Sequence, residues 1–318
     1  MKPIGVNPRS LTPVLWYVGA SVLLFYSGFF SFLFAVPLQV AYYRWGDKRG
    51  ITVATVTAAA IVVVHLLQSL RFDEVGSQVL RIMLLDSLMP IGLLAGLTVF
   101  NIARGYPWWV RLLTAAGIAV AGALPSLRLL HQAVEGEGAL AEQLTSMLTI
   151  LGVDDNAQLW IEMVQRVVFS SVGLGLTVAV AANWWIGRNI AFRGTAPVSV
   201  LRTARVPDQM IWVVISGLAV VVLGWLRDVP FWAEIIGWNS LLIASFLFAV
   251  QGIGIAQHLL VLRGVGPLGE RWVLTGVLIL IFLPGINVVV SIALPLFGMS
   301  ELWIDYKRGE SHESDIEQ

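Results

Sequence analysis

Long apolar runs occupy most of this 318-residue chain. The clearest of them cover residues 51–70, 82–102, 108–130, 159–186, 210–226, 235–262 and 272–297. A helix of about 20 apolar residues is long enough to cross the ~30 Å hydrocarbon layer of a bilayer. Because lipid offers no hydrogen-bond partners to the backbone, such runs can cross a membrane only as helices or closed barrels, and their length fits helices. The sequence therefore predicts an all-α fold, a polytopic transmembrane bundle of about eight or nine spans.

The composition supports a membrane location and excludes several classes of function. Hydrophobic residues make up 57% and charged residues 13% of the chain, whereas soluble domains contain about 25% charged residues. The formal net charge is zero, which argues against a nucleic-acid partner. The chain has no cysteine, which excludes disulfides and thiolate metal sites. We expect the lipid bilayer as a partner, and no cofactor or metal.

Two of the apolar segments contain internal breaks. Residues 11–43 would form a helix of ~50 Å, too long for one straight span, and Gly28 and Pro37 interrupt them. The sequence predicts two short helices, about 12–27 and 30–44, joined near Ser27 and Gly28, with a single tilted helix as the alternative. The run 272–297 is broken at Pro284 and Gly285. Its length favours one kinked span, and a re-entrant helix pair is the alternative.

Charges in the loops alternate along the chain. One set of loops is basic and contains Arg44, Lys48, Arg49, Arg104, Arg111, Arg188, Arg193, Arg202, Arg205, Arg263 and Arg271. The loops between them are acidic or of mixed charge. Basic loops remain in the cytoplasm during membrane insertion. This pattern predicts a cytoplasmic N-terminus if residues 11–43 form a hairpin.

Residues 137–151 differ from the apolar runs. Leucine and methionine recur there at helical spacing, with polar residues between them. The segment is too short and too polar to span a bilayer, so we expect an amphipathic helix on the outer surface, with a soluble lid packed on the bundle as the alternative. The rest of residues 1–309 is expected to form a single transmembrane domain. The acidic tail 310–318 is expected to be disordered.

Four short motifs distributed over almost the whole chain carry a family resemblance. They are Pro37-Leu38 followed by Tyr42-Tyr43-Arg44-Trp45-Gly46, then Arg205-Val206-Pro207, then Phe248-Ala249-Val250-Gln251-Gly252-Ile253-Gly254-Ile255-Ala256, and finally Gly298-Met299-Ser300-Glu301-Leu302-Trp303-Ile304-Asp305-Tyr306-Lys307-Arg308. In these motifs the chain resembles the YybS-like family of bacterial inner-membrane proteins, a domain of unknown function.

The resemblance implies a fold and a location. The family is distantly similar to the S-components of energy-coupling-factor vitamin transporters, so it implies an S-component-like bundle with a cavity for a small molecule. It also implies a multi-pass protein of the bacterial inner (cytoplasmic) membrane. No catalytic residues transfer from the family to this sequence.

Two ionisable residues lie inside apolar runs, where a charge at mid-helix costs about 2.5–3.5 kcal/mol. His65 and Asp86 are placed near the outer ends of neighbouring antiparallel helices. A His–Asp pair there would form an outward-facing polar ligand site. The favoured alternative is interfacial: Asp86 is solvated or paired with Arg81, and His65 bonds a neighbouring helix.

Three amides also lie within or near the ends of spans, namely Asn239, Gln251 and Asn287. Amides commonly hydrogen-bond one transmembrane helix to another, for about 0.6 kcal/mol each. That structural role is favoured for all three. A ligand pocket lined by them is the less favoured hypothesis.

These observations leave three functional hypotheses. The first is a transporter-like or small-molecule-binding membrane protein. The second is a non-transporting envelope scaffold that binds a membrane-protein partner. A lipid-handling enzyme is the least favoured, because the chain lacks hydrolase and metalloprotease motifs. The sequence therefore predicts that the protein is not an enzyme.

Overall fold

A computed structural model describes residues 12–69, 82–134, 150, 157–192, 201–227, 229–265, 267–304 and 306. These residues form helices joined by turns and short loops, with no strand among them. The predicted all-α helical bundle is confirmed. Apart from Ile150, the predicted surface helix 137–151 lies outside the described residues, as does the tail 310–318.

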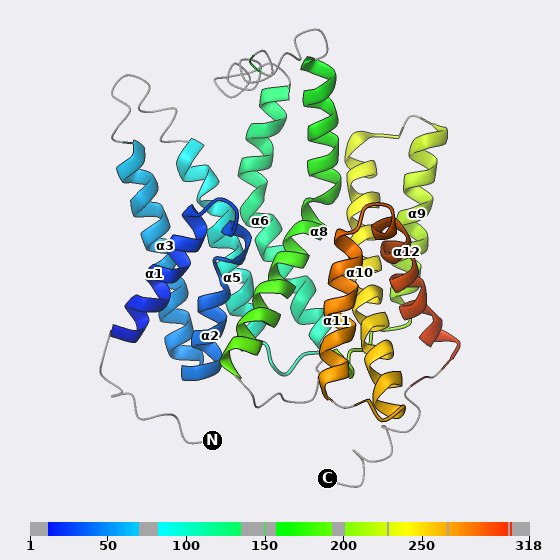
Figure 1. Cartoon of the computed structure of the whole chain (residues 1–318). Coiled ribbons are helices and arrows are strands. Elements are labelled where there is room, and N and C mark those ends of the chain that lie inside the picture. Colours follow the sequence, from blue (N-terminus) through cyan, green and yellow to red (C-terminus); the bar gives the residue numbers. More distant parts are fainter. Residues whose placement is uncertain are drawn as a thin grey trace. The chain divides into compact units, whose positions relative to one another are not determined.

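The chain divides into two compact units, residues 1–194 and residues 195–318. Figure 1 draws the first in blue to green and the second in yellow-green to red. The helices of the first unit are α1 (Thr12–Tyr26), η1 (Ser31–Leu33), α2 (Val36–Trp45), α3 (Asp47–Ser69), α5 (Leu88–Ile102), α6 (Trp108–Val134) and α8 (Ala157–Ala191). The helices of the second are α9 (Met210–Leu226), α10 (Phe231–Leu262), α11 (Pro267–Phe282), α12 (Ile286–Met299) and η3 (Ser300–Leu302). The single domain over residues 1–309 stays a prediction.

Five of the described helices are long and apolar enough to cross a membrane. They cover Asp47–Ser69, Ile82–Ile102, Trp108–Gln132, Leu159–Ala191 and Phe231–Leu262. Shorter apolar helices occur at Thr12–Tyr26, Met210–Leu226, Val273–Phe282 and Ile286–Leu302. The predicted total of eight or nine spans includes these shorter helices, and whether each of them crosses the bilayer stays a prediction.

The first apolar segment forms two helices. Helix α1 ends at Tyr26, Gly28 takes a positive φ of 71°, and the chain enters α2 at Val36 after the short helix η1. Glycine adopts a positive φ without steric cost, so Gly28 permits the turn between the helices. The predicted helix pair is confirmed, and the alternative of one tilted helix is wrong.

The run 272–297 is also divided. Helix α11 ends at Phe282, Gly285 has a positive φ of 82°, and α12 begins at Ile286. The two helices contact each other, and both contact α10. In Figure 1 the chain reverses direction between α11 and α12. The structure therefore supports the helix pair, and the single kinked span favoured by length is wrong.

Small residues bring α5 and α6 into close contact. A Cβ atom added to Gly92 would lie 2.9 Å from the Cα of Gly122, and one added to Gly122 would lie 2.5 Å from the carbonyl oxygen of Leu88. A Cβ at Gly96 would collide with the carbonyl of Ala115. In lipid, helices associate largely through such close packing. These glycines therefore join α5 to α6 within the first unit.

We predict that Gly122→Ala destabilises the first unit by about 1–3 kcal/mol, because the added methyl overpacks the α5–α6 contact. Gly117→Ala on the same helix is the matched control, since a Cβ there meets nothing within 4 Å. Alanine has the higher helix propensity, so the control should be neutral or slightly stabilising. Thermal unfolding of both variants in detergent measures the difference. Equal midpoints would contradict the proposed packing.

Candidate functional site

His65 is bonded across helices. Its side chain on α3 is only 7% exposed, and its Nδ1 lies 2.5 Å from the Oγ of Ser87, just before α5. The Tyr26 ring lies edge-on to the imidazole, with 5.8 Å between the ring centres, and the centre of the Phe25 ring lies 6.1 Å from that of the imidazole. His65 thus joins α1, α3 and the start of α5, as the interfacial alternative predicted.

The hypothesis of a His65–Asp86 pair is not supported. The side chain of Asp86 is exposed, and the partner of His65 is the next residue, Ser87. Successive residues on a helix point about 100° apart. Because Ser87 faces His65, the adjacent Asp86 points in another direction. Arg81, the proposed rival partner, lies outside the described residues.

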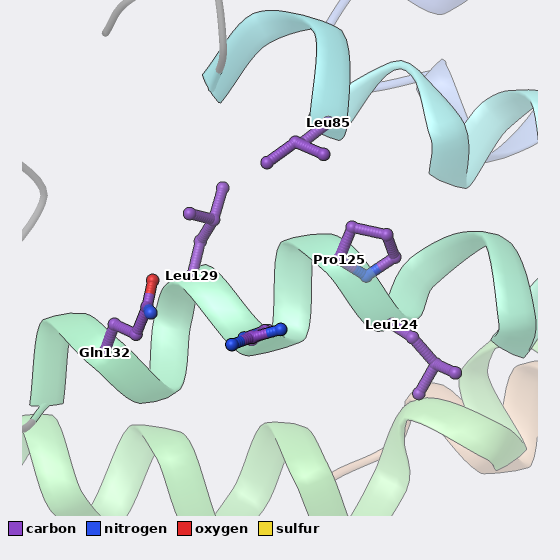
Figure 2. Close-up of a pocket in the computed structure, with 6 residues that line it drawn as sticks. Leu85, Leu124, Pro125, Leu129 and Gln132 are labelled. Carbon is purple, nitrogen blue, oxygen red and sulfur yellow. The ribbon is translucent and has the colours of Figure 1, made fainter.

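An open groove of about 380 Å³ lies between residues 82–86 and α6. Residues 82–86 form one wall through Leu85, and α6 supplies the rest (Figure 2). The lining side chains are Leu85, Leu124, Pro125, Arg128, Leu129 and Gln132. Pro125 lies inside α6, where proline removes one helical hydrogen bond and kinks the helix. The groove is therefore apolar except for one guanidinium and one amide.

Arg128 carries the only charge among the lining residues. Its side chain is exposed, and it makes no ion pair or hydrogen bond with another described residue. An anionic group in the groove would accept a charge-assisted hydrogen bond from this guanidinium. The arrangement suits a ligand that has an apolar part and an anionic group.

Gln251 connects three segments of the second unit. It is 2% exposed on α10. Its Oε1 accepts a hydrogen bond from the backbone N–H of Val206 at 2.6 Å, and its Nε2 donates to the carbonyl of Gly298 at 3.1 Å. Val206 precedes α9, and Gly298 lies near the end of α12. The favoured structural role of Gln251 is therefore confirmed.

Glycines around Gln251 allow the backbones to approach closely. A Cβ on Gly252 would lie 2.5 Å from the carbonyl oxygen of Leu294. One on Gly298 would collide with the carbonyl of Phe248, and one on Gly254 with the carbonyl of Leu201. The Arg-Val-Pro, Gln-Gly and closing motifs of the sequence thus meet at one tightly packed junction.

The predicted pocket of three amides does not form around Gln251. Asn239 lies twelve residues earlier on α10, about 18 Å along the helix, and donates to the carbonyl of Ile235 at 2.9 Å. Asn287 lies at the start of α12, eleven residues before Gly298, or about 16 Å along that helix. Its Oδ1 accepts from the N–H of Val288 at 2.9 Å. Asn239 and Asn287 therefore both lie away from Gln251, whose own hydrogen bonds join segments that are distant in the sequence.

The groove was not predicted from the sequence. Its signals were Arg128 and Pro125, a charge and a helix-distorting residue within the apolar run 108–130. Ser87 was also missed as the partner of His65, because a serine in an apolar run commonly bonds its own helix. Ser87 does donate to the carbonyl of Met83 at 2.8 Å, in addition to its contact with His65.

Compared with models of protein families, curated proteins and solved structures, the chain matches none. The YybS-like resemblance therefore stays a prediction. The helices nevertheless define the class of protein. Only 28% to 39% of the residues in the spanning windows are buried, so most of their apolar side chains require a nonpolar surrounding. The chain is a helical integral membrane protein, with lipid in contact with these helices.

We predict that Gln251→Leu destabilises the second unit by about 1–3 kcal/mol, because the change leaves the buried N–H of Val206 without its partner. It also removes one donor from the Gly298 carbonyl, which still accepts from the backbone N–H of Ser300. Asn287→Ala is the control amide, because it removes only a bond to the adjacent residue. Chemical unfolding in detergent compares the two. Unchanged stability of Gln251→Leu would show that the junction is not held by this amide.

Ser87→Ala should destabilise the first unit by about 1–3 kcal/mol, because it removes a hydrogen-bond partner of the buried His65 ring. Ser171→Ala provides a matched control, since the Ser171 hydroxyl donates only to the carbonyl of Val167 on its own helix. The pH dependence of thermal unfolding adds a second measurement. A variant with the wild-type unfolding midpoint at every pH would exclude a stabilising role for the His65–Ser87 contact.

Proposed function

We propose that this protein binds a small amphiphilic molecule, as a transporter-like membrane protein of the S-component type. The ligand lies in the groove between residues 82–86 and α6, with its apolar part against Leu85, Leu124 and Leu129. Its anionic group meets Arg128. The observation that carries the proposal is an apolar groove of about 380 Å³ whose one charged lining residue, Arg128, has no partner among the described residues.

The size and lining of the groove support this type of ligand. Small-molecule sites in proteins have volumes of about 300–1,000 Å³ and are mostly apolar, with a few polar groups that fix orientation. Gln132 supplies an amide beside the guanidinium. None of the described residues that line the groove is a carboxylate that could compete for Arg128.

Charge placement in the first unit supports an orientation. The end where α2 leads into α3 contains Arg44 and Lys48, and Arg104, just after α5, pairs with Asp47 at this same end. Basic ends remain cytoplasmic, which supports an orientation with the groove toward the outer face. Helix α1 begins at the basic end, because α1 and α2 form a hairpin. This agrees with a cytoplasmic N-terminus, and with the bacterial inner membrane implied by the family resemblance.

The alternative is an envelope scaffold that binds another membrane protein through its helices. The observation in its favour is that a Cβ on Gly117 or Gly175 would meet nothing within 4 Å. Against it, Gly92, Gly96 and Gly122 are already packed within the α5–α6 pair. A stoichiometric protein companion after mild extraction, with no ligand in the groove, would support the scaffold.

Binding of cis-parinarate, a fluorescent fatty-acid anion, tests the groove in purified full-length protein. Energy transfer from tryptophan reports binding, and the neutral methyl ester is the control ligand. We predict that Arg128→Gln weakens parinarate binding about tenfold, the usual value of one charge-assisted hydrogen bond, and leaves the ester unchanged. Leu129→Trp should weaken both ligands by filling the groove.

Two controls make this experiment decisive. Arg128→Lys retains the charge and should bind parinarate more tightly than Arg128→Gln. Arg227→Gln, which removes an exposed charge after α9, should bind parinarate as the wild type does. Wild-type affinity in both Arg128→Gln and Leu129→Trp would overturn the proposed site.

A further inference from the structure

Aromatic and arginine side chains from four helices meet at the basic end of the first unit. We call Tyr43, Phe100, Arg111, Trp184 and Arg188 the Tyr43 cluster. The rings of Phe100 and Trp184 lie 5.3 Å apart. The Arg111 guanidinium lies 4.2 Å from the Phe100 ring centre, and that of Arg188 lies 5.9 Å from the Trp184 ring. The Phe100 ring thus contacts the guanidinium of Arg111, and the Trp184 ring contacts that of Arg188.

Several hydrogen-bond donors of the cluster have no acceptor. The Tyr43 hydroxyl oxygen accepts from the Nε1–H of Trp184 at 2.6 Å, but its own proton has no acceptor among the described residues. Arg111 donates through Nε to the carbonyl of Phe100 at 2.8 Å, and its two terminal nitrogens have no hydrogen-bond partner among the described residues. Arg188 makes no hydrogen bond with any residue that the structure describes.

No carboxylate of the described chain neutralises these arginines. The Asp47 carboxylate, at the same end of the unit, is already paired with Arg104. Arg188, Arg111 and Arg104 all lie close enough to the Tyr43 hydroxyl to act on it electrostatically. Arg111 and Arg188 are both half-buried. Half-buried guanidinium groups are usually paired with an anion, because partial desolvation makes an isolated charge costly.

The polypeptide beneath the cluster is fixed by packing and hydrogen bonds. Asn101, next to Phe100, donates to Gln39 Oε1 at 3.0 Å, which joins α5 to α2. Gly187, next to Arg188, lies so close to Gln39 that a Cβ would collide with that side chain, which joins α8 to α2. The donors of the Tyr43 cluster are therefore held by neighbouring residues of the core, as a preorganised binding site requires.

We propose that the Tyr43 cluster binds a phosphate group. Two guanidinium groups and one hydroxyl provide the donors that phosphate oxygens accept, with the geometry and charge that arginine supplies for this ligand. The phosphate belongs either to a phospholipid headgroup or to a free phosphate. The site lies where α2 and α8 end and α6 begins, which is the level of lipid headgroups for helices that span a bilayer.

The test measures phosphate binding to the full-length protein in detergent. Native mass spectrometry compares added phosphatidylglycerol with phosphatidylcholine, and a thermal-shift titration uses inorganic phosphate. We expect Arg188→Gln and Arg111→Gln each to weaken binding about tenfold, the value of one charge-assisted hydrogen bond. Arg188→Gln removes no hydrogen bond to described residues, so folding should be retained. Arg111→Lys should restore part of the binding.

Lys48→Gln is the matched control, since it removes an exposed charge at the same end of the unit. Lipid binding that falls in the arginine variants but not in Lys48→Gln supports a headgroup site. A phosphate-induced shift that is lost in the same variants supports a free-phosphate site. Equal loss in Lys48→Gln and Arg188→Gln would reveal only nonspecific charge attraction and would overturn the proposal. Wild-type binding of both probes in the arginine variants would also overturn it.

Discussion

The structure depends on polar side chains that join apolar helices where water is absent. Lipid is as apolar as leucine, so association of helices in a bilayer relies on close packing and interhelical hydrogen bonds. Gln251 and Asn101 supply such bonds in the two units. In both places glycine allows the backbones to approach, as Gly252 and Gly187 show. The hydrogen bonds and glycine contacts that stabilise the helices therefore also position the residues of the candidate sites.

The same constraint explains why the two ends of the first unit differ. At one end His65 is hydrogen-bonded to Ser87, and α6, with Pro125 inside it, forms an apolar groove that includes Arg128. At the other end aromatic rings support Arg111 and Arg188 without a carboxylate. A cation in a nonpolar surrounding is retained only where a partner offsets its desolvation. Half-buried Arg111 and Arg188 have no carboxylate partner among the described residues, so an anionic ligand would change the balance most at their end of the unit.

Sequence patterns predicted those features that depend on the backbone. Gly28 marked the turn between α1 and α2, because a positive φ is almost confined to glycine. At Gly285 the length of the apolar run favoured one kinked span, so the turn between α11 and α12 was the alternative. Gln251 was predicted to join helices because a buried amide needs partners. The partner of His65 could not be predicted, because a difference of one residue, from Asp86 to Ser87, depends on the rotation of one helix against another. Segments far apart in the chain form the Tyr43 cluster, so no local motif indicates it.

The small residues of α5 and α6 distinguish the ligand-binding hypothesis from the scaffold hypothesis. A scaffold needs a close-packing face that is open to a partner, whereas in α5 and α6 that face is already occupied by Gly92 and Gly122. The close approach of these helices continues toward Leu88, next to Ser87, and on α6 it ends before Pro125 distorts the helix. The α5–α6 packing and the groove are thus neighbouring parts of one helix pair. A ligand in the groove would contact the same pair, so its binding and the stability of the α5–α6 contact should be energetically coupled.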